Sequence, residues 1–365
     1  MKELIETMVR WLAQGESFVL ATLFARAGSA PRAAGARMLI REDGTSVGTI
    51  GGGLLDAQAQ KSAVELFTRR GAVAREFSLA GEQVSEMDMV CGGDVEVLIE
   101  FVDATDSIHR DLYEGVLEAM GNAEKAWLLT QLPAPSGGQG PVHRCLVRQD
   151  GSITGAVTSQ WTVGGGRGSP IGLFGAEPDQ SESCIDLASA KKPVLAECGP
   201  QRLLVEPVFG NSTVYIFGAG HISRQLAPLC KLVGFETVVL DDRAVFASAE
   251  RFEAVDQLIV LDSFEDALGD LSIRDDSFVV IVTRGHTHDQ AVLAQALRTN
   301  TAYIGMIGSV RKRDAVYHAL AEEGFAANDF SRVHSPIGLS IGAETPEEIA
   351  VCIVAELIQV RAERE

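Results

Sequence analysis

The sequence predicts an α/β protein in two parts: a Rossmann-like, doubly wound parallel sheet, preceded by a β-rich α+β domain with an internal repeat. Residues 213–242 read as a strand, a glycine turn, a helix and a second strand that ends in two acids. The N-terminal half contains the pattern R-x-L-[IV]-R-x-D-G-[ST]-x-x-G twice, at 37–48 and 144–155. We therefore expect a duplicated domain over 1–208 and a Rossmann-like domain over 213–365.

The glycine turn after the first C-terminal strand indicates a nucleotide-like ligand. Gly218 allows a tight turn, and Gly220 lets the backbone approach a pyrophosphate at the start of the following helix. Asp241, 23 residues after Gly218, is suited to ribose hydroxyls. The third glycine of the usual pattern is replaced by Ser223. The residues expected to hold the nucleotide-like group are Gly218, Gly220, His221, Asp241, Asp242 and Arg243.

Three more segments follow the ends of expected strands, where open α/β sheets bind ligands. They cover 278–290, 303–313 and 334–346, and the last contains His334, Gly338, Gly342 and Glu344. Glycine permits close backbone approach, and arginine, lysine and helix N-termini suit phosphate groups. Together the segments favour a phosphorylated ligand. The residues expected to contact it are Thr283, Arg284, His286, Gly305, Gly308, Ser309, Lys312 and Arg313.

His286, His288 and Asp289 allow two interpretations. In an extended segment the two imidazoles would point the same way and could share a metal ion. The alternative is that one histidine caps a helix while the other bonds a ligand or the backbone. We favour the second interpretation, because the spacing places no third or fourth metal ligand.

The N-terminal half has its own candidate anion site. Arg32 and Arg37 offer forked donors to a carboxylate, a phosphate or an oxyanion such as molybdate. Gly51, Gly52 and Gly53 could expose backbone N–H groups ahead of a helix near 57–70. Cys91 has two open interpretations: a small buried apolar residue, or an exposed thiol able to ligate a soft metal.

Composition limits the function further. The net charge of −19, from 31 basic and 50 acidic residues, argues against broad binding to nucleic acid or to anionic membranes. The six cysteines contain no CxxC pair, which indicates reduced thiols rather than disulfides or a zinc site. The start of the chain is typical of an amphipathic helix rather than a signal peptide, so we expect a cytoplasmic protein. A homodimer is the commonest assembly for such a protein.

Motifs along nearly the whole chain resemble the xanthine dehydrogenase accessory factor family, XdhC/CoxI. They are GSAPRxxGARM (28–38), GTIGGG (48–53), MVCGG (89–93), VYIFGAGHIS (214–223), LDDR (240–243), TRGHTHD (283–289), GMIGSVRKR (305–313) and GLSIGAETPEEIA (338–350). The resemblance implies a chaperone that binds the molybdenum cofactor, as molybdopterin or its dinucleotide form. It also implies two partners: a cysteine desulfurase that installs the terminal sulfur, and a molybdenum hydroxylase of the xanthine or aldehyde dehydrogenase type that receives the cofactor.

By this resemblance, Cys91 with Gly51–Gly53 and Arg37 would handle the cofactor, and Cys91 would approach the molybdenum. In the alignment of the two repeats Cys198 stands opposite Cys91, and its role is left open. The competing interpretation is an NAD(P)- or flavin-dependent oxidoreductase, with His286 or His288 as acid/base and Arg284 holding a substrate carboxylate. We favour a cofactor chaperone over an enzyme.

Overall fold

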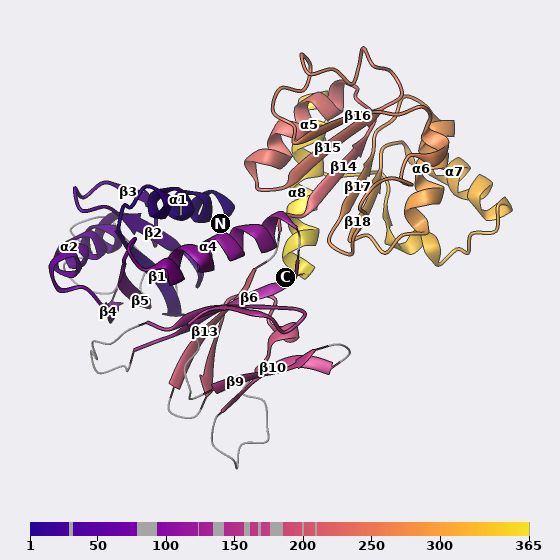
Figure 1. The fold of residues 1–365 in the computed structure, drawn as a ribbon. Coiled ribbons are helices and arrows are strands. Elements are labelled where there is room, and N and C mark those ends of the chain that lie inside the picture. The colour runs from indigo at the N-terminus through magenta and orange to yellow at the C-terminus, as the bar shows by residue number, and fades with distance from the viewer. Residues whose placement is uncertain are drawn as a thin grey trace. The chain divides into compact units, whose positions relative to one another are not determined.

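The protein divides into two compact units, Met1–Gly210 and Asn211–Glu365. The division lies inside the segment 209–212 that separates the two expected domains. Figure 1 traces the chain through both units. The computed structural model describes residues 1–28, 32–78, 93–122, 124–133, 142–156, 161–166, 169–175, 185–198, 201–208 and 210–364.

The described residues of the first unit form two five-stranded antiparallel sheets and one smaller sheet. The first sheet, in the order β3-β2-β1-β5-β4, consists of β1 (Phe18–Ala27), β2 (Arg37–Ile40), β3 (Ser46–Gly48), β4 (Ala72–Ser78) and β5 (Asp94–Val102). The second, in the order β12-β13-β6-β7-β8, consists of β6 (Ala126–Gln131), β7 (Arg144–Arg148), β8 (Ile153–Gly155), β12 (Val194–Cys198) and β13 (Gln201–Val208). The third consists of β9 (Trp161–Gly166), β10 (Ser169–Gly175) and β11 (Ile185–Asp186), and η1 (Leu187–Ser189) follows it.

The two five-stranded sheets match strand for strand, as the sequence repeat predicts. The hairpins β2–β3 and β7–β8 correspond, β1 matches β6, and β5 matches β13. Each hairpin turns at an Asp-Gly pair whose glycine, Gly44 or Gly151, has a positive φ of 84° or 87°. The left-handed backbone at these turns suits glycine, which explains the spacing that the two copies share.

Helices α1 (Lys2–Ala13) and α4 (Ser107–Gly121) join the two sheets through one core, which includes Trp11, Phe18, Tyr113 and Leu128. The amphipathic pattern predicted α1 correctly, because its apolar side chains at i, i+3 and i+7 are buried. Helix α2 (Gly53–Arg69) packs on the first sheet through a separate apolar cluster.

Two buried ion pairs connect the repeats reciprocally. Arg37, which opens the first repeat, pairs with Glu206 of the second, and Arg144, which opens the second, pairs with Glu100 of the first. The surroundings of the two pairs differ. Arg144 also donates to Tyr113 Oη (2.7 Å) and to Thr130 Oγ1 (2.8 Å).

At the other pair, three buried atoms lack a hydrogen-bond partner among the described residues: Thr22 Oγ1, Arg37 Nε and Glu206 Oε1. Thr22 faces Arg37 across the sheet as Thr130 faces Arg144. The duplicated core is therefore satisfied at one pair and incompletely satisfied at the other.

The second unit is a six-stranded parallel sheet in the order β16-β15-β14-β17-β18-β19. Its strands are β14 (Thr213–Phe217), β15 (Glu236–Asp241), β16 (Gln257–Val260), β17 (Phe278–Ile281), β18 (Tyr303–Met306) and β19 (Val333–His334). Numbered within the unit, this is the order 3-2-1-4-5-6 of a Rossmann fold, which confirms the predicted fold class. The sequence placed a strand end before 334 but did not give the bounds of β19, because two residues carry no readable periodicity.

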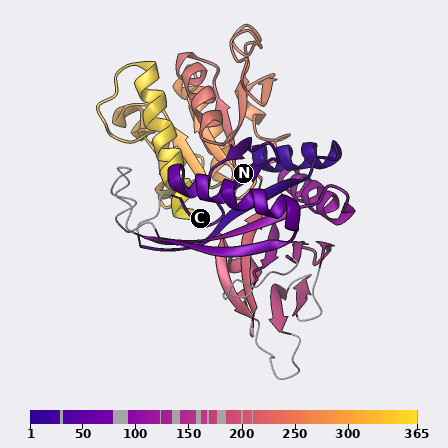
Figure 2. The ribbon, with the colours of Figure 1, turned by 90° about the vertical axis from the view of Figure 1, so that its left-hand side faces the viewer.

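Helices cover both faces of this sheet. Helices α5 (His221–Leu232) and α8 (Pro346–Arg364) pack together on one face, as Figure 2 shows, and α6 (His286–Leu297) and α7 (Val310–Glu322) share the core of the other. Two short helices, η2 (Phe264–Asp266) and η3 (Asp329–Arg332), complete the unit. None of the described helices is long and apolar enough to cross a membrane.

Helix α8 begins with a capping box. Glu348 N–H donates to Thr345 Oγ1 (3.3 Å), and Thr345 N–H donates to Glu348 Oε2 (3.1 Å). Both partners lie within one helical turn, so this cap depends on local sequence alone.

Candidate ligand site at the carboxyl edge of the parallel sheet

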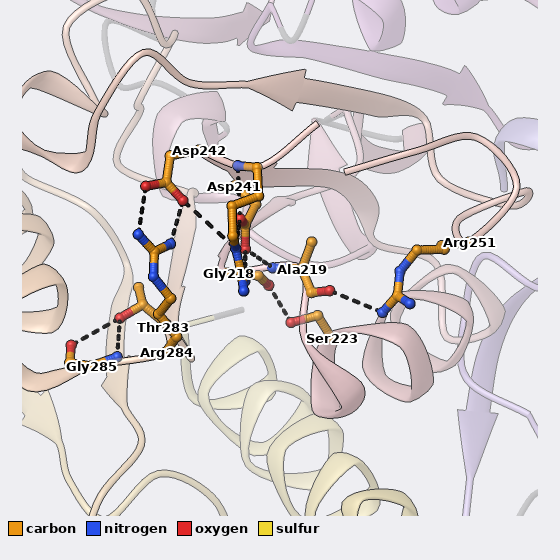
Figure 3. A network of polar contacts seen from close by, with 10 residues as sticks. Gly218, Ala219, Ser223, Asp241, Asp242, Arg251, Thr283, Arg284 and Gly285 are labelled. Atoms are coloured by element: carbon orange, nitrogen blue, oxygen red, sulfur yellow. Dashed lines mark hydrogen bonds and ion pairs between the residues drawn. The ribbon is translucent and has the colours of Figure 1, made fainter. Parts of the chain in front are cut away.

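The glycine turn after β14 is held close to the end of β17. Gly218 has a φ of 107°, and a Cβ atom there would lie 2.5 Å from the carbonyl oxygen of Val282. Ser223 is fully buried, and its hydroxyl donates to the Gly218 carbonyl. The serine that replaces the third glycine therefore ties the first turn of α5 to the glycine turn (Figure 3).

Asp241, expected to receive ribose hydroxyls, is engaged inside the protein. Its carboxylate is 1% exposed and accepts the Ala219 N–H (2.8 Å) and the Arg243 N–H (3.0 Å). The Arg243 side chain adds two bonds, of 2.8 and 2.9 Å, and the bond to Asp241 raises the pKa of that guanidinium. This geometry does not support the expected contact with ribose. It shows Asp241 fixing the glycine turn instead.

Asp242 and Arg284 form an ion pair between the ends of β15 and β17, the two neighbours of β14. Arg284 Nη2 donates to Asp242 Oδ2 at 2.8 Å, and Nη1 donates to Oδ1 (Figure 3). These bonds lower the pKa of Asp242 to about 2. Strand order reverses at β14, so the pair lies at the switch point where such sheets bind ligands.

Thr283, Asp289 and Lys312 form a second polar cluster at this edge. Asp289 is fully buried, accepts the Thr283 hydroxyl (2.6 Å) and pairs with the Lys312 ammonium. Burial raises the pKa of Asp289, while Lys312 and Thr283 oppose that rise. Lys312 also donates to the Ile307 carbonyl (3.2 Å). Lys312, like Arg284 and Arg243, therefore already faces a carboxylate.

Two helices begin at this edge with unused anion-binding capacity. Helices α5 and α6 have Gly220 and Gly285 as N-caps, and neither end has a side-chain cap. A Cβ atom at either glycine would meet no atom within 4 Å. The first N–H groups of a helix lack internal partners and carry the positive end of its dipole, so both ends suit phosphate oxygens.

Gly285 was absent from the expected site residues, although a glycine between a strand and a helix could have indicated it.

Ser309, which was expected to bind the ligand, accepts the Lys312 N–H (3.3 Å) and caps α7. Gly305 and Gly308 have packing roles. A Cβ atom at Gly305 would collide with the Tyr303 ring, and one at Gly308 would lie 2.8 Å from Lys312 Cδ. Arg313 donates to the Ser335 carbonyl (3.3 Å) and pairs with its neighbour Asp314.

The two histidines at the start of α6 do not form the extended arrangement that a shared metal requires. His286 opens the helix and is exposed, whereas the His288 ring packs on Phe264 with centroids 5.0 Å apart. Residues two apart on a helix do not share a face. Among the described residues, no group of three or more histidines, cysteines and acids could hold a metal ion.

The N-terminal candidates are not gathered into one site by the described residues. Arg37 is buried in its pair with Glu206, which does not support its expected role as a ligand contact, whereas Arg32 is exposed. Gly51 N–H donates to Thr49 Oγ1 (3.2 Å), Gly52 is the N-cap of α2, and Gly53 is its first residue. Cys91 lies outside the described residues.

Comparisons with known proteins follow the same division into two units. A family model for the XdhC Rossmann domain matches residues 214–357, and a model for the XdhC and CoxI family matches residues 11–78. The chain is 27% identical to a crystal structure described as a xanthine dehydrogenase from Bacillus halodurans. That match has a TM-score of 0.77 and covers 100% of this chain and 96% of the other.

Three curated proteins are similar in sequence. The uncharacterized protein YqeB of Escherichia coli K12 is 32% identical over 243 residues, which are 62% of this chain and 42% of YqeB. A probable xanthine dehydrogenase subunit from Bacillus subtilis 168 is 25% identical over 96% of this chain and 95% of its own length. The molybdenum cofactor insertion chaperone PaoD of E. coli K12 is 21% identical over 100% of this chain and 90% of its own length. The two models together match more than half of the chain, so the chain belongs to the XdhC and CoxI family.

Proposed function

We propose that the chain is an accessory factor that binds the molybdenum cofactor, protects it during sulfuration and delivers it to a xanthine dehydrogenase-type molybdenum hydroxylase. The observation that carries this proposal is its similarity to a cofactor insertion chaperone over the full chain. The similarity to a probable xanthine dehydrogenase subunit is consistent with a hydroxylase partner. A cysteine desulfurase and a second copy of the chain are further proposed partners.

The carboxyl edge of the parallel sheet fits the phosphate part of this cofactor. The cofactor carries a terminal phosphate or, in its dinucleotide form, a pyrophosphate. Helices α5 and α6 begin after the adjacent strands β14 and β17. Neither helix start has a side-chain cap, and there is open space at Gly220 and Gly285. We assign the phosphate or pyrophosphate to these N–H groups. The helix dipole already provides positive charge there, so the anion can bind without a charged side chain.

The basic side chains at this edge would bind the ligand by exchanging their present carboxylate partners for its phosphate. Arg284 is held by Asp242 and Lys312 by Asp289. A phosphate that reached either cation would replace a carboxylate as its partner, so the gain in affinity is the difference between two ion pairs. Binding at this edge is therefore selective for ligands that also use the helix N-termini.

Cys91 remains the proposed ligand of the molybdenum. A thiolate suits a soft metal centre, and two of the described thiols, Cys145 and Cys230, are unsuited to that role. Burial raises the pKa of each of these two to about 12, so both stay protonated at neutral pH.

The test is retention of cofactor by protein purified from cells that produce molybdenum hydroxylases. We expect molybdenum by elemental analysis and pterin fluorescence after release. Cys91→Ala should lower the molybdenum content, whereas the matched control Cys230→Ala should retain it. A purified protein that carries flavin, or that reduces NAD with a small substrate, and that is unaffected by Cys91→Ala would overturn the proposal in favour of an oxidoreductase.

A further inference from the structure

A polar cluster with no role in the site above lies on the α5/α8 face of the parallel sheet. Glu356 of α8 accepts hydrogen bonds from the Tyr303 hydroxyl and from the Gly338 N–H (2.9 Å). Its other oxygen lies 3.2 Å from His334 Nδ1. His334 is the last residue of β19, so the cluster reaches the carboxyl edge where the proposed ligand binds.

The carboxylate of Glu356 favours a proton on Nδ1 of His334. Burial alone would raise the pKa of Glu356, but the bonds from His334, Tyr303 and Gly338 hold it below its ordinary value. Glu356 is therefore ionised at neutral pH and can only accept hydrogen bonds. His334 Nδ1 faces this carboxylate as a donor, and Nε2 is the acceptor whenever the ring is neutral.

The ring is held in place yet remains accessible. Its side chain is 37% exposed, and it packs on the Tyr303 ring with centroids 4.6 Å apart. The Tyr303 ring passes over Gly305, where a side chain would collide with it. Packing and the bond to Glu356 therefore restrict the imidazole, while part of it faces solvent.

The residue after His334 adds a second polar group, the hydroxyl of Ser335. Ser335 Oγ is buried and has no hydrogen-bond partner among the described residues. Its backbone carbonyl is held by Arg313 of α7, the residue after Lys312. The hydroxyl therefore sits on a segment that is tied to the ligand edge from the opposite face of the sheet.

We propose that His334 and Ser335 form a subsite that hydrogen-bonds a hydroxyl or ring N–H group of the molecule bound at the carboxyl edge. Glu356 and Tyr303 are positioning residues, which act through His334 and need not touch the ligand. The inference rests on the proposed function, because it assumes that a ligand occupies this edge. The polar, uncharged part of the ligand would then lie on the α5/α8 face, and its phosphates would lie at the starts of α5 and α6.

The first test needs no ligand. Long-range proton–nitrogen NMR of the imidazoles should show His334 with its proton on Nδ1. Glu356→Gln should change that spectrum, and Tyr303→Phe should alter it less, because it leaves the carboxylate in place. A His334 ring with its proton on Nε2 in the wild-type protein would overturn the proposal, whatever the protein binds.

The second test measures binding of ADP, and of molybdenum cofactor released from a purified molybdoenzyme, by calorimetry. Losing an acceptor for a ligand proton should weaken binding by about tenfold in His334→Ala. His318, an exposed histidine of α7 paired with Glu322, supplies the matched control, and His318→Ala should bind as the wild type does.

The outcomes separate the two proposals. If the wild-type protein binds a probe and His334→Ala binds it equally well, the subsite is wrong and the site at the helix starts stands. If the wild-type protein binds neither probe, both the proposed function and the subsite fail. Circular dichroism of each variant distinguishes weakened binding from misfolding.

Discussion

Replacing each buried arginine–glutamate pair of the first unit by apolar residues should affect stability differently at the two pairs. The variants are Arg144→Met with Glu100→Leu, and Arg37→Met with Glu206→Leu. Exchanging a buried ion pair for apolar residues is often neutral, or stabilising by about 1–4 kcal/mol. The two sites differ in what the exchange leaves behind.

At the first site, the exchange removes the arginine that now bonds to the hydroxyls of Tyr113 and Thr130. These two residues are 1% and 0% exposed, so water cannot replace the lost partner. An unsatisfied buried group costs about 1–3 kcal/mol. At the second site, the exchange removes two atoms that already lack described partners, Arg37 Nε and Glu206 Oε1. The first double variant should therefore be less stable than the second by about 2–6 kcal/mol, the cost of two hydroxyls.

Urea unfolding followed by tryptophan fluorescence reports this difference. The chain has three tryptophans, Trp11, Trp127 and Trp161, and all belong to the first unit. Single variants at either arginine should each cost about 3–5 kcal/mol, because a buried carboxylate loses its counter-charge. Equal stability of the two double variants, or a less stable Arg37/Glu206 variant, would refute the reasoning from unsatisfied atoms.

Three further predictions concern the second unit. Asp242→Asn should tighten ADP binding measured by calorimetry, because Arg284 loses its internal partner; weaker binding would show that the carboxylate itself contacts the ligand. The pKa of Asp242 is lowered from 3.8 to about 2, so its stabilising effect is complete above pH 3.8 and is lost as the pH falls through about 2. The difference in unfolding free energy between wild type and Asp242→Asn, measured by circular dichroism, should vanish over that window, and a constant difference would argue against the pair. Gly218→Ala should destabilise the unit by about 1–3 kcal/mol through its positive φ and the contact with Val282, whereas Gly220→Ala, with φ −79° and open space, should leave the melting temperature unchanged.

Local patterns in the sequence predicted the elements of the fold. The strands of the second unit and the amphipathic helix α1 were readable, because each shows in a pattern of neighbouring residues. The internal repeat likewise indicated two similar sheets. The bounds of two-residue β19 were missed because so short a strand has no periodicity.

The candidate site was only partly readable from the sequence. The strand-end segments meet at one edge because parallel strands end on the same side of a sheet. The role of each side chain was less accessible: Ser223 replaces a glycine by bonding to the turn itself, and Gly285 became a candidate only when α6 was seen to start there without a side-chain cap.

The sequence by itself determined the order of the strands and helices, the duplication, and the edge at which a ligand can bind. Only the tertiary structure decided which charges remain available to that ligand. Arg37 pairs with Glu206, 169 residues away, and Asp241 at the end of β15 bonds Ala219 in the turn after the adjacent strand β14. Partners of this kind are set by the packing of sheets, and burial strengthens the need for each charge to find one. The spacing of residues along the chain does not indicate which distant partner each charged side chain will meet.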